Sequence, residues 1–208
     1  MKIFLMGASG MIGARILAEA VARGHEVIAA ARNPEKIAAL PGVTRVAVDA
    51  NDTAALAAQA AQADVYVSAV SPRSTGDAVT EAAGYREALL AAARTAGKRV
   101  IVVGGAGTLT FADGTPVMAK LPDFIVPEAT GMKALKDALV QSDLDWTFFA
   151  PAATIAPGSR SGQFRLGGEV LLADAGGDSR ISAEDYAMAL LDEVETPAHR
   201  RAVFTIAY

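Results

Sequence analysis

The chain has 208 residues, of which 52% are hydrophobic and 20% are charged, and its formal net charge is -4. This balance fits one folded domain with a sizeable core, and no apolar run reaches the roughly 18 residues of a membrane-spanning helix. The acidic balance without basic blocks argues against nucleic-acid binding. With no cysteine and only two histidines, the chain lacks disulfides, thiol nucleophiles and the means to build a zinc cluster, so we expect no metal site.

The N-terminal residues lead directly into an apolar run, without the basic and apolar segments of a signal peptide. We therefore expect a cytoplasmic protein that does not bind membranes. Nothing in the sequence decides between a monomer and a dimer.

The first predicted elements are a strand over residues 2–6 and an amphipathic helix that ends near residues 23–24. Between them lies the turn GASGMIG at 7–13, whose three glycines suit a tight turn, bare backbone near a phosphate, and close packing of helix on strand. The helix N-terminus adds free N–H groups and a positive dipole end. We predict that this turn binds a dinucleotide diphosphate; the alternative is a purely structural turn.

Strand-like runs alternate with helical stretches along the rest of the chain, which is typical of a parallel sheet. Helix N-caps are expected at Asp52, Asp77 and Ser182, and C-terminal caps at Gly24 and Gly97. We predict an α/β fold in one domain over residues 1–208: a doubly wound, Rossmann-like parallel sheet of about seven strands with helices on both faces. The expected strands cover residues 2–6, 26–30, 43–48, 65–69, 99–103, 146–150 and 202–206.

Two Gly- and Pro-rich segments, 104–127 and 151–177, interrupt this alternation after strands of the sheet. Ligands of open α/β sheets bind outside the carboxyl ends of the strands, so we interpret these segments as walls of a substrate pocket. Ordinary surface loops are the alternative. Four apolar side chains in them are candidates for stacking on a flat substrate: Phe111, Met118, Phe124 and Phe164.

The residue after the second strand indicates which coenzyme binds. An acidic side chain about twenty residues beyond the glycine turn usually holds the ribose of NAD. Here the chain offers Arg32 instead, whose planar cation suits a 2′-phosphate, with Lys36 one turn further on. NADP(H) is therefore favoured over NAD(H); the alternative is a surface arginine near Glu35.

The ends of the third and fourth strands supply further candidates for the coenzyme site. Asp49, with the Ala50 backbone beside it, either accepts a hydrogen bond from the adenine amino group or caps the next helix. After the fourth strand, the backbone is expected to pass close to the ribose and diphosphate, and Arg73 either adds a cation or is a solvated loop charge. The candidates after this strand are Ala69, Val70, Ser71 and Arg73.

Six motifs together point to a known family: GASGMIG at 7–13, RGHEV at 23–27, ARNP at 31–34, VGGAGTL at 103–109, LDWTFFAP at 144–151 and ISAEDYA at 181–187. With them the chain resembles, over nearly its whole length, the atypical short-chain dehydrogenases/reductases of the NAD(P)H-binding group, which includes NADH-flavin reductases, biliverdin-IXβ/flavin reductases and NmrA-like proteins. The resemblance implies that the Pro151-Ala152 backbone lies near the nicotinamide carboxamide and that Gly104 also binds the coenzyme.

Carbonyl-reducing members of this superfamily carry a Tyr-x-x-x-Lys pair, in which the tyrosine protonates the nascent alkoxide. If Lys133 corresponds to that lysine, Ala129 occupies the place of the tyrosine. Lys133 would then hydrogen-bond the nicotinamide ribose, or it is a helix surface lysine. The resemblance places Thr108 near the usual active-site serine, so Thr108 and Lys133 are the catalytic candidates, but a neutral hydroxyl is a poor acid alone.

A flavin or quinone acceptor does not need the missing acid, because hydride then reaches a conjugated system that spreads the charge. We therefore predict an NAD(P)H-dependent reductase of flat conjugated acceptors, with a flavin as a possible substrate. The first alternative is a non-catalytic NADP(H)-binding sensor or regulatory protein of the NmrA-like type. A carbonyl reductase or epimerase that takes its acid from Tyr85 or Tyr186 is the second alternative.

Overall fold

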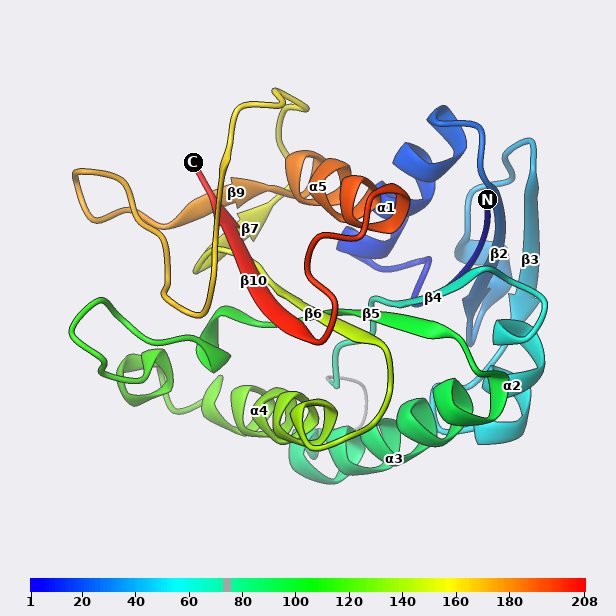
Figure 1. Ribbon diagram of the computed structural model, residues 1–208, viewed down its shortest axis with the longest axis horizontal. Helices are drawn as coiled ribbons and strands as arrows, with labels where there is room; N and C mark the ends of the chain where they lie inside the picture. Colours follow the sequence, from blue (N-terminus) through cyan, green and yellow to red (C-terminus); the bar gives the residue numbers. More distant parts are fainter. Residues whose placement is uncertain (73–75) are drawn as a thin grey trace.

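The computed structural model describes residues 1–72 and 76–208. Its central sheet has eight strands in the order β3-β2-β1-β4-β5-β6-β10-β8 (Figure 1). All neighbours are parallel except β8, which is antiparallel to β10. The strands are β1 (Lys2–Met6), β2 (Glu26–Ala31), β3 (Val43–Ala47), β4 (Val65–Ser68), β5 (Arg99–Val103), β6 (Trp146–Ala150), β8 (Arg165–Gly167) and β10 (Ala202–Ala207).

Helices cover both faces of this sheet, so the predicted doubly wound α/β fold is confirmed. Figure 1 shows α1 and α5 on one face and α2, α3 and α4 on the other. Side chains alternate between the two layers: Ile3 and Leu5 of β1 pack toward α1 and α5, whereas Phe4 and Met6 pack toward the other helices. The helices are α1 (Met11–Ala22), α2 (Thr53–Ala60), α3 (Ala78–Ala96), α4 (Val126–Val140) and α5 (Ala183–Glu195).

The expected helix caps are present. Asp52, Asp77 and Ser182 each accept a hydrogen bond from a backbone N–H in the first turn of α2, α3 and α5. Gly97 is the left-handed C-cap of α3, and Gly24, also at positive φ, follows the C-cap of α1. These short-range signals therefore fixed helix ends correctly.

The sheet has one strand more than the expected count, and a second, small sheet lies beside it. All seven expected strands are present, β8 is added at one edge, and β7 (Thr154–Ala156) pairs in parallel with β9 (Arg180–Ser182). Three short 3-10 helices occupy connections: η1 (Pro34–Lys36), η2 (Ala106–Thr108) and η3 (Val117–Lys120). In the described part of the chain, no helix is both long and apolar enough to cross a bilayer.

Candidate coenzyme and substrate site

The turn between β1 and α1 leaves no space for side chains at two of its glycines. A Cβ on Gly7, whose φ is +86°, would lie 2.5 Å from the carbonyl oxygen of Ala69, and one on Gly13 would lie 2.1 Å from the carbonyl oxygen of Gly7. The N–H groups of Gly7 and Ala8 both donate to the carbonyl oxygen of Ala30, at 2.9 and 3.1 Å. The turn is thus held tightly against β2 and β4 and presents bare backbone.

The start of α1 is suited to an anion. Its N-cap, Gly10, provides no side-chain cap, and the first turn of the helix contains no acidic residue. The N–H groups of a first helical turn have no partner inside the helix, and the helix dipole is positive there. The start of α1 therefore suits a diphosphate, and a Cβ at Gly7 or Gly13 would force the turn out of this shape.

A cavity of about 630 Å³ opens beside this turn, at the carboxyl ends of the parallel strands. Here the chain order reverses between β1 and β4, which is where open α/β sheets bind their ligands. Ala8 and Gly13 do not line the cavity, because they pack behind the turn. The candidate residues that line it are Gly7, Ser9, Gly10, Met11, Ile12, Arg32, Asp49, Ala50, Ala69, Val70, Ser71, Gly104, Thr108, Pro151 and Ala152.

Arg32 is an exposed cation in the cavity wall, directly after β2. Among residues 1–72 and 76–208 it has neither an ion-pair nor a hydrogen-bond partner. Glu35 lies 3.8 Å from Arg45 instead. Lys36, the last residue of η1, is exposed and does not line the cavity. The guanidinium of Arg32 is therefore available to a ligand.

Two polar residues lie where β3 ends. Asp49 accepts a hydrogen bond from the backbone N–H of Asn51 at 2.8 Å, and the cap of α2 is Asp52. Asp49 thus closes the turn before the helix, and its side chain is exposed in the cavity wall. Asn51 also lines the cavity and was not a sequence candidate.

The end of β4 contacts the start of α4 across the cavity. The Ser71 hydroxyl donates to a carboxylate oxygen of Glu128 at 2.8 Å, and both residues line the cavity. Arg73, the candidate cation of this loop, lies outside the described residues.

The two lysines of α4 that matter here point in different directions. Lys133 is half-exposed, does not line the cavity, and places its Nζ 2.6 Å from Asp137 Oδ2. Lys136 is buried and donates to the carbonyl oxygen of Thr108 at 2.9 Å. Sequence reasoning missed Lys136, although its spacing from Ala129 and Met132, which both line the cavity, places it on the inward face of the helix.

Thr108 forms part of the cavity wall at the end of η2. Its hydroxyl donates to the carbonyl oxygen of Gly105 at 2.8 Å, so its proton already has an acceptor. Ala129 lies opposite: a Cβ on Gly107 would come within 2.9 Å of the Ala129 Cβ. The loop of residues 104–127 therefore packs directly on α4 at Ala129.

The four apolar candidates for the substrate pocket do not line the cavity. Phe111 packs against the α2–α4 core with the Lys120 ammonium 5.1 Å from its ring, and Phe164 packs toward α1 and α5. The Met118 sulfur accepts a hydrogen bond from Thr130, and Phe124 is 83% exposed beside a smaller hollow. Other apolar side chains line the cavity instead, among them Leu121, Ile125, Ala129, Met132 and Ile155.

The second Gly/Pro-rich segment reaches the cavity only through residues 151–153 and 155. Pairing of β7 with β9, and of β8 with β10, carries the remainder away from the cavity. Short strands, which the Gly- and Pro-rich composition did not predict, thus place most of residues 151–177 outside the cavity wall.

Two buried tyrosines were alternative proton donors, but the structure does not bring either to the cavity. The Tyr85 hydroxyl is hydrogen-bonded to Ser68 at 2.7 Å, and that of Tyr186 donates to the carbonyl oxygen of Phe149 at 2.6 Å. Burial raises the pKa of both phenols. Among the described residues, no cluster of three or more His, Asp or Glu side chains could hold a metal ion.

Comparison with known proteins identifies relatives over the full length. A family model described as NAD(P)H-binding matches residues 7–197. A structure from Burkholderia pseudomallei, provisionally named an exported protein, is 44% identical, covers 100% of both chains and has a TM-score of 0.88. One from Bacteroides thetaiotaomicron, provisionally named an epimerase, is 36% identical over 100% of this chain and 96% of that chain, with a TM-score of 0.93.

A third structure, from Streptococcus pneumoniae, is provisionally named an NADH-flavin reductase. It is 29% identical over 100% of this chain and 99% of that chain, with a TM-score of 0.88. The names of these relatives differ in both activity and location. The acceptor and the cytoplasmic location therefore stay predictions for this chain.

Proposed function

Because the chain belongs to the NAD(P)H-binding family, we propose that it is an NAD(P)H-dependent reductase, with NADPH preferred, that reduces a flavin, a quinone or a similar flat conjugated acceptor. The observation that carries this proposal is the acceptor end of the cavity. This end is lined by Thr108, Leu121, Ile125, Ala129 and Met132. Ala129 has the place that the resemblance implies for a proton-donating tyrosine, and the Thr108 hydroxyl already donates its proton to the carbonyl oxygen of Gly105.

The chain's own residues would bind and orient the two reactants. The N–H groups at the N-terminus of α1 would hold the diphosphate, and Arg32 would hold the 2′-phosphate. Pro151 and Ala152 would border the nicotinamide. When bound, NADPH supplies the hydride.

The apolar wall of Leu121, Ile125 and Met132 would then hold the acceptor ring flat and exclude water. Orientation of this kind is a large part of catalysis when the acceptor itself spreads the added charge and takes its proton from solvent. A ketone gains no such help, because no tyrosine at position 129 can protonate its alkoxide.

The same replacement at position 129 favours a second candidate, a sensor that binds NADP(H) without turnover. Binding of a regulatory partner would then depend on whether NADP⁺ or NADPH fills the cavity. A catalysed oxidation of NADPH separates the two candidates.

The test is NADPH oxidation with riboflavin, menadione and a simple aliphatic ketone as acceptors. We expect rapid oxidation with the first two and none with the ketone. Gly13→Ala, in which a Cβ would collide with the Gly7 carbonyl, is the matched variant without a coenzyme cradle. Tight NADPH binding with no turnover of any flavin, quinone or dye would remove the reductase and leave the sensor.

A further inference from the structure

Lys136 is a buried ammonium that joins three parts of the molecule. It lies on the inward face of α4 with only 9% of its surface exposed. Its Nζ donates to the carbonyl oxygen of Thr108 at 2.9 Å and to Glu169 Oε2 at 3.0 Å. Desolvating an ammonium is costly unless it is paired and hydrogen-bonded. These two contacts therefore fix where Thr108 and Glu169 lie relative to the helix.

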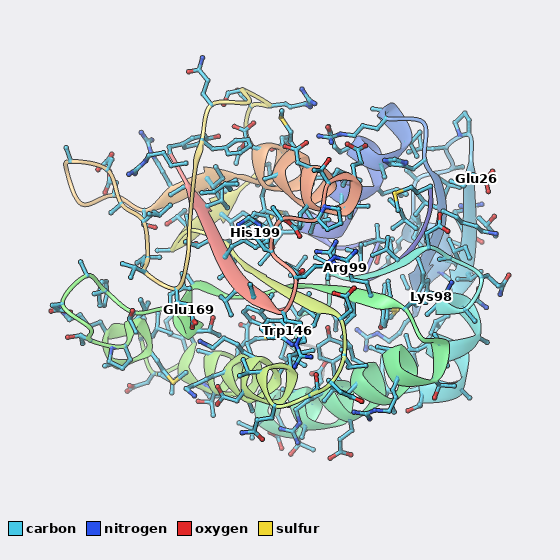
Figure 2. The ribbon with its side chains drawn as sticks, in the orientation of Figure 1. Glu26, Lys98, Arg99, Trp146, Glu169 and His199 are labelled. Carbon is cyan, nitrogen blue, oxygen red and sulfur yellow. The ribbon has the colours of Figure 1, made fainter. Side chains whose placement is uncertain are left out.

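The two loops that carry Thr108 and Glu169 also meet through their backbones. The Thr110 N–H donates to the carbonyl oxygen of Glu169 at 3.0 Å, and the Leu171 N–H donates to that of Thr110 at 2.8 Å. Figure 2 shows Glu169 beside the first loop and α4. Lys136 thus secures one end of a short bridge between the loop of residues 104–127 and that of residues 151–177.

Thr108 connects this bridge to the cavity. The carbonyl oxygen of Thr108 accepts a hydrogen bond from the Lys136 ammonium, and Thr108 also forms part of the cavity wall at the acceptor end. Lys136 itself does not line the cavity. Any movement of the bridge must therefore move the wall, although Lys136 touches no ligand.

We propose that Lys136 is a positioning residue: by tying the Thr108 and Glu169 segments to α4, it holds the acceptor end of the cavity in its binding shape. The role in acceptor binding rests on the proposed reductase function, whereas the role in ordering the two loops does not. A wall held in advance saves the cost of ordering it when the acceptor binds. Among the described residues, Lys136 makes no hydrogen bond or ion pair to β1, β2 or α1, where the coenzyme would bind.

The test compares Lys136→Met, which keeps the apolar stem, with Glu169→Gln, which keeps the shape of its partner. Lys136→Arg restores the positive charge. Arg94→Met is the control, because it removes an exposed cation paired with Asp143 at 3.5 Å, away from both loops. Amide hydrogen exchange, coenzyme binding and the KM for riboflavin are measured for each.

In Lys136→Met we expect exchange at the Thr110 and Leu171 amides to be about tenfold faster, since a hydrogen bond to a charged group is lost. Glu169→Gln should give a smaller rise of about threefold, as for a half-exposed pair. The riboflavin KM should rise about tenfold in Lys136→Met, with coenzyme binding unchanged, and Lys136→Arg should recover most of the loss. Arg94→Met should match the wild type.

Unchanged exchange at both amides in Lys136→Met would overturn the proposal, and so would an equal rise throughout β1. If Lys136→Met does not fold, the exchange rates of the Thr110 and Leu171 amides in Glu169→Gln and Lys136→Arg decide whether the proposal stands. If no acceptor is turned over, the reductase function fails, but the exchange rates still decide whether Lys136 orders the loops.

Discussion

At the scale of single residues, the proposed preference for NADPH over NADH depends on Arg32. It follows β2 at the edge of the cavity and is unpaired within the described residues, whereas Arg45, on the adjacent strand β3, donates to the carbonyl oxygen of Ile37 and lies near Glu35. A permanently charged planar group with no internal partner gains most from a doubly charged ligand.

We expect Arg32→Ala to weaken NADPH binding by roughly 1.5 to 3 kcal/mol, the scale of a hydrogen bond to a charged group, and to leave NADH binding nearly unchanged. Titration with nicotinamide fluorescence as the signal measures both affinities. Arg45→Ala is the control and should change neither. Equal losses for the two coenzymes would show that Arg32 does not read the 2′-phosphate.

The lysines of α4 show what residue spacing can and cannot predict. Resemblance selects Lys133 by its place in a motif, yet successive helical residues are turned by about 100°, so Lys133 and Lys136 cannot share a face with Ala129 equally well. Packing of Met132 and Leu139 into the core decides which face turns inward. That decision depends on the whole layer, and the motif alone does not contain it.

At the scale of elements, the contact of α1 with β1 depends on one glycine. Gly13 brings the first turn of the helix so close to the glycine turn that a Cβ would lie 2.1 Å from the Gly7 carbonyl oxygen. Neighbouring backbone cannot yield as a flexible side chain would. The helix would have to shift away from the strand.

Gly13→Ala is therefore expected to destabilise the fold by about 1 to 3 kcal/mol, as overpacking does, and to abolish coenzyme binding. Urea unfolding and the nicotinamide titration measure the two effects. Gly168→Ala is the matched control, because a Cβ there meets nothing within 4 Å. Wild-type coenzyme affinity in Gly13→Ala would show that the turn does not need this close contact.

The longer strands and the helix caps were predictable from the sequence, and the three-residue strands were not. The seven expected strands and the caps at Asp52, Asp77 and Ser182 follow from apolar runs and local hydrogen bonding. Strands β7, β8 and β9 have three residues each, which is too few to show an alternating pattern in the sequence. They form through their partners: β7 pairs with β9, and β8 pairs with β10. Phe164 directly precedes β8, so the pairing of β8 with β10 explains why Phe164 lies outside the predicted pocket.

At the scale of the whole molecule, a buried carboxylate ties α5 to the amino edge of the sheet. Glu193 accepts hydrogen bonds from the His199 ring and backbone, from the Ala198 N–H and from the Arg99 guanidinium. Figure 2 shows Arg99 and His199 at this junction. Burial alone would raise the pKa of Glu193, but these donors outweigh it and hold the pKa below its usual value.

A carboxylate whose pKa is lower in the folded state stabilises the fold above its unfolded pKa and loses that contribution as pH falls through the folded pKa. We expect Glu193→Gln to unfold at lower urea than the wild type near neutral pH. The difference in urea stability between Glu193→Gln and the wild type should narrow as pH falls below about 4, which is near the usual pKa of glutamate. Glu87→Gln, at an exposed position, should follow the wild-type curve. Parallel curves for Glu193→Gln and the wild type at all pH values would contradict this account.

The strand order also has a consequence for how the chain is made. Residues up to Ala150 contain β3, β2, β1, β4, β5 and β6, which are neighbours in the sheet and can assemble while a ribosome is still extending the chain. The β8 segment cannot join them, because its pairing partner in the sheet, β10, is translated more than thirty residues later. The nascent protein would therefore form most of the cavity wall first and add the far edge of its sheet last.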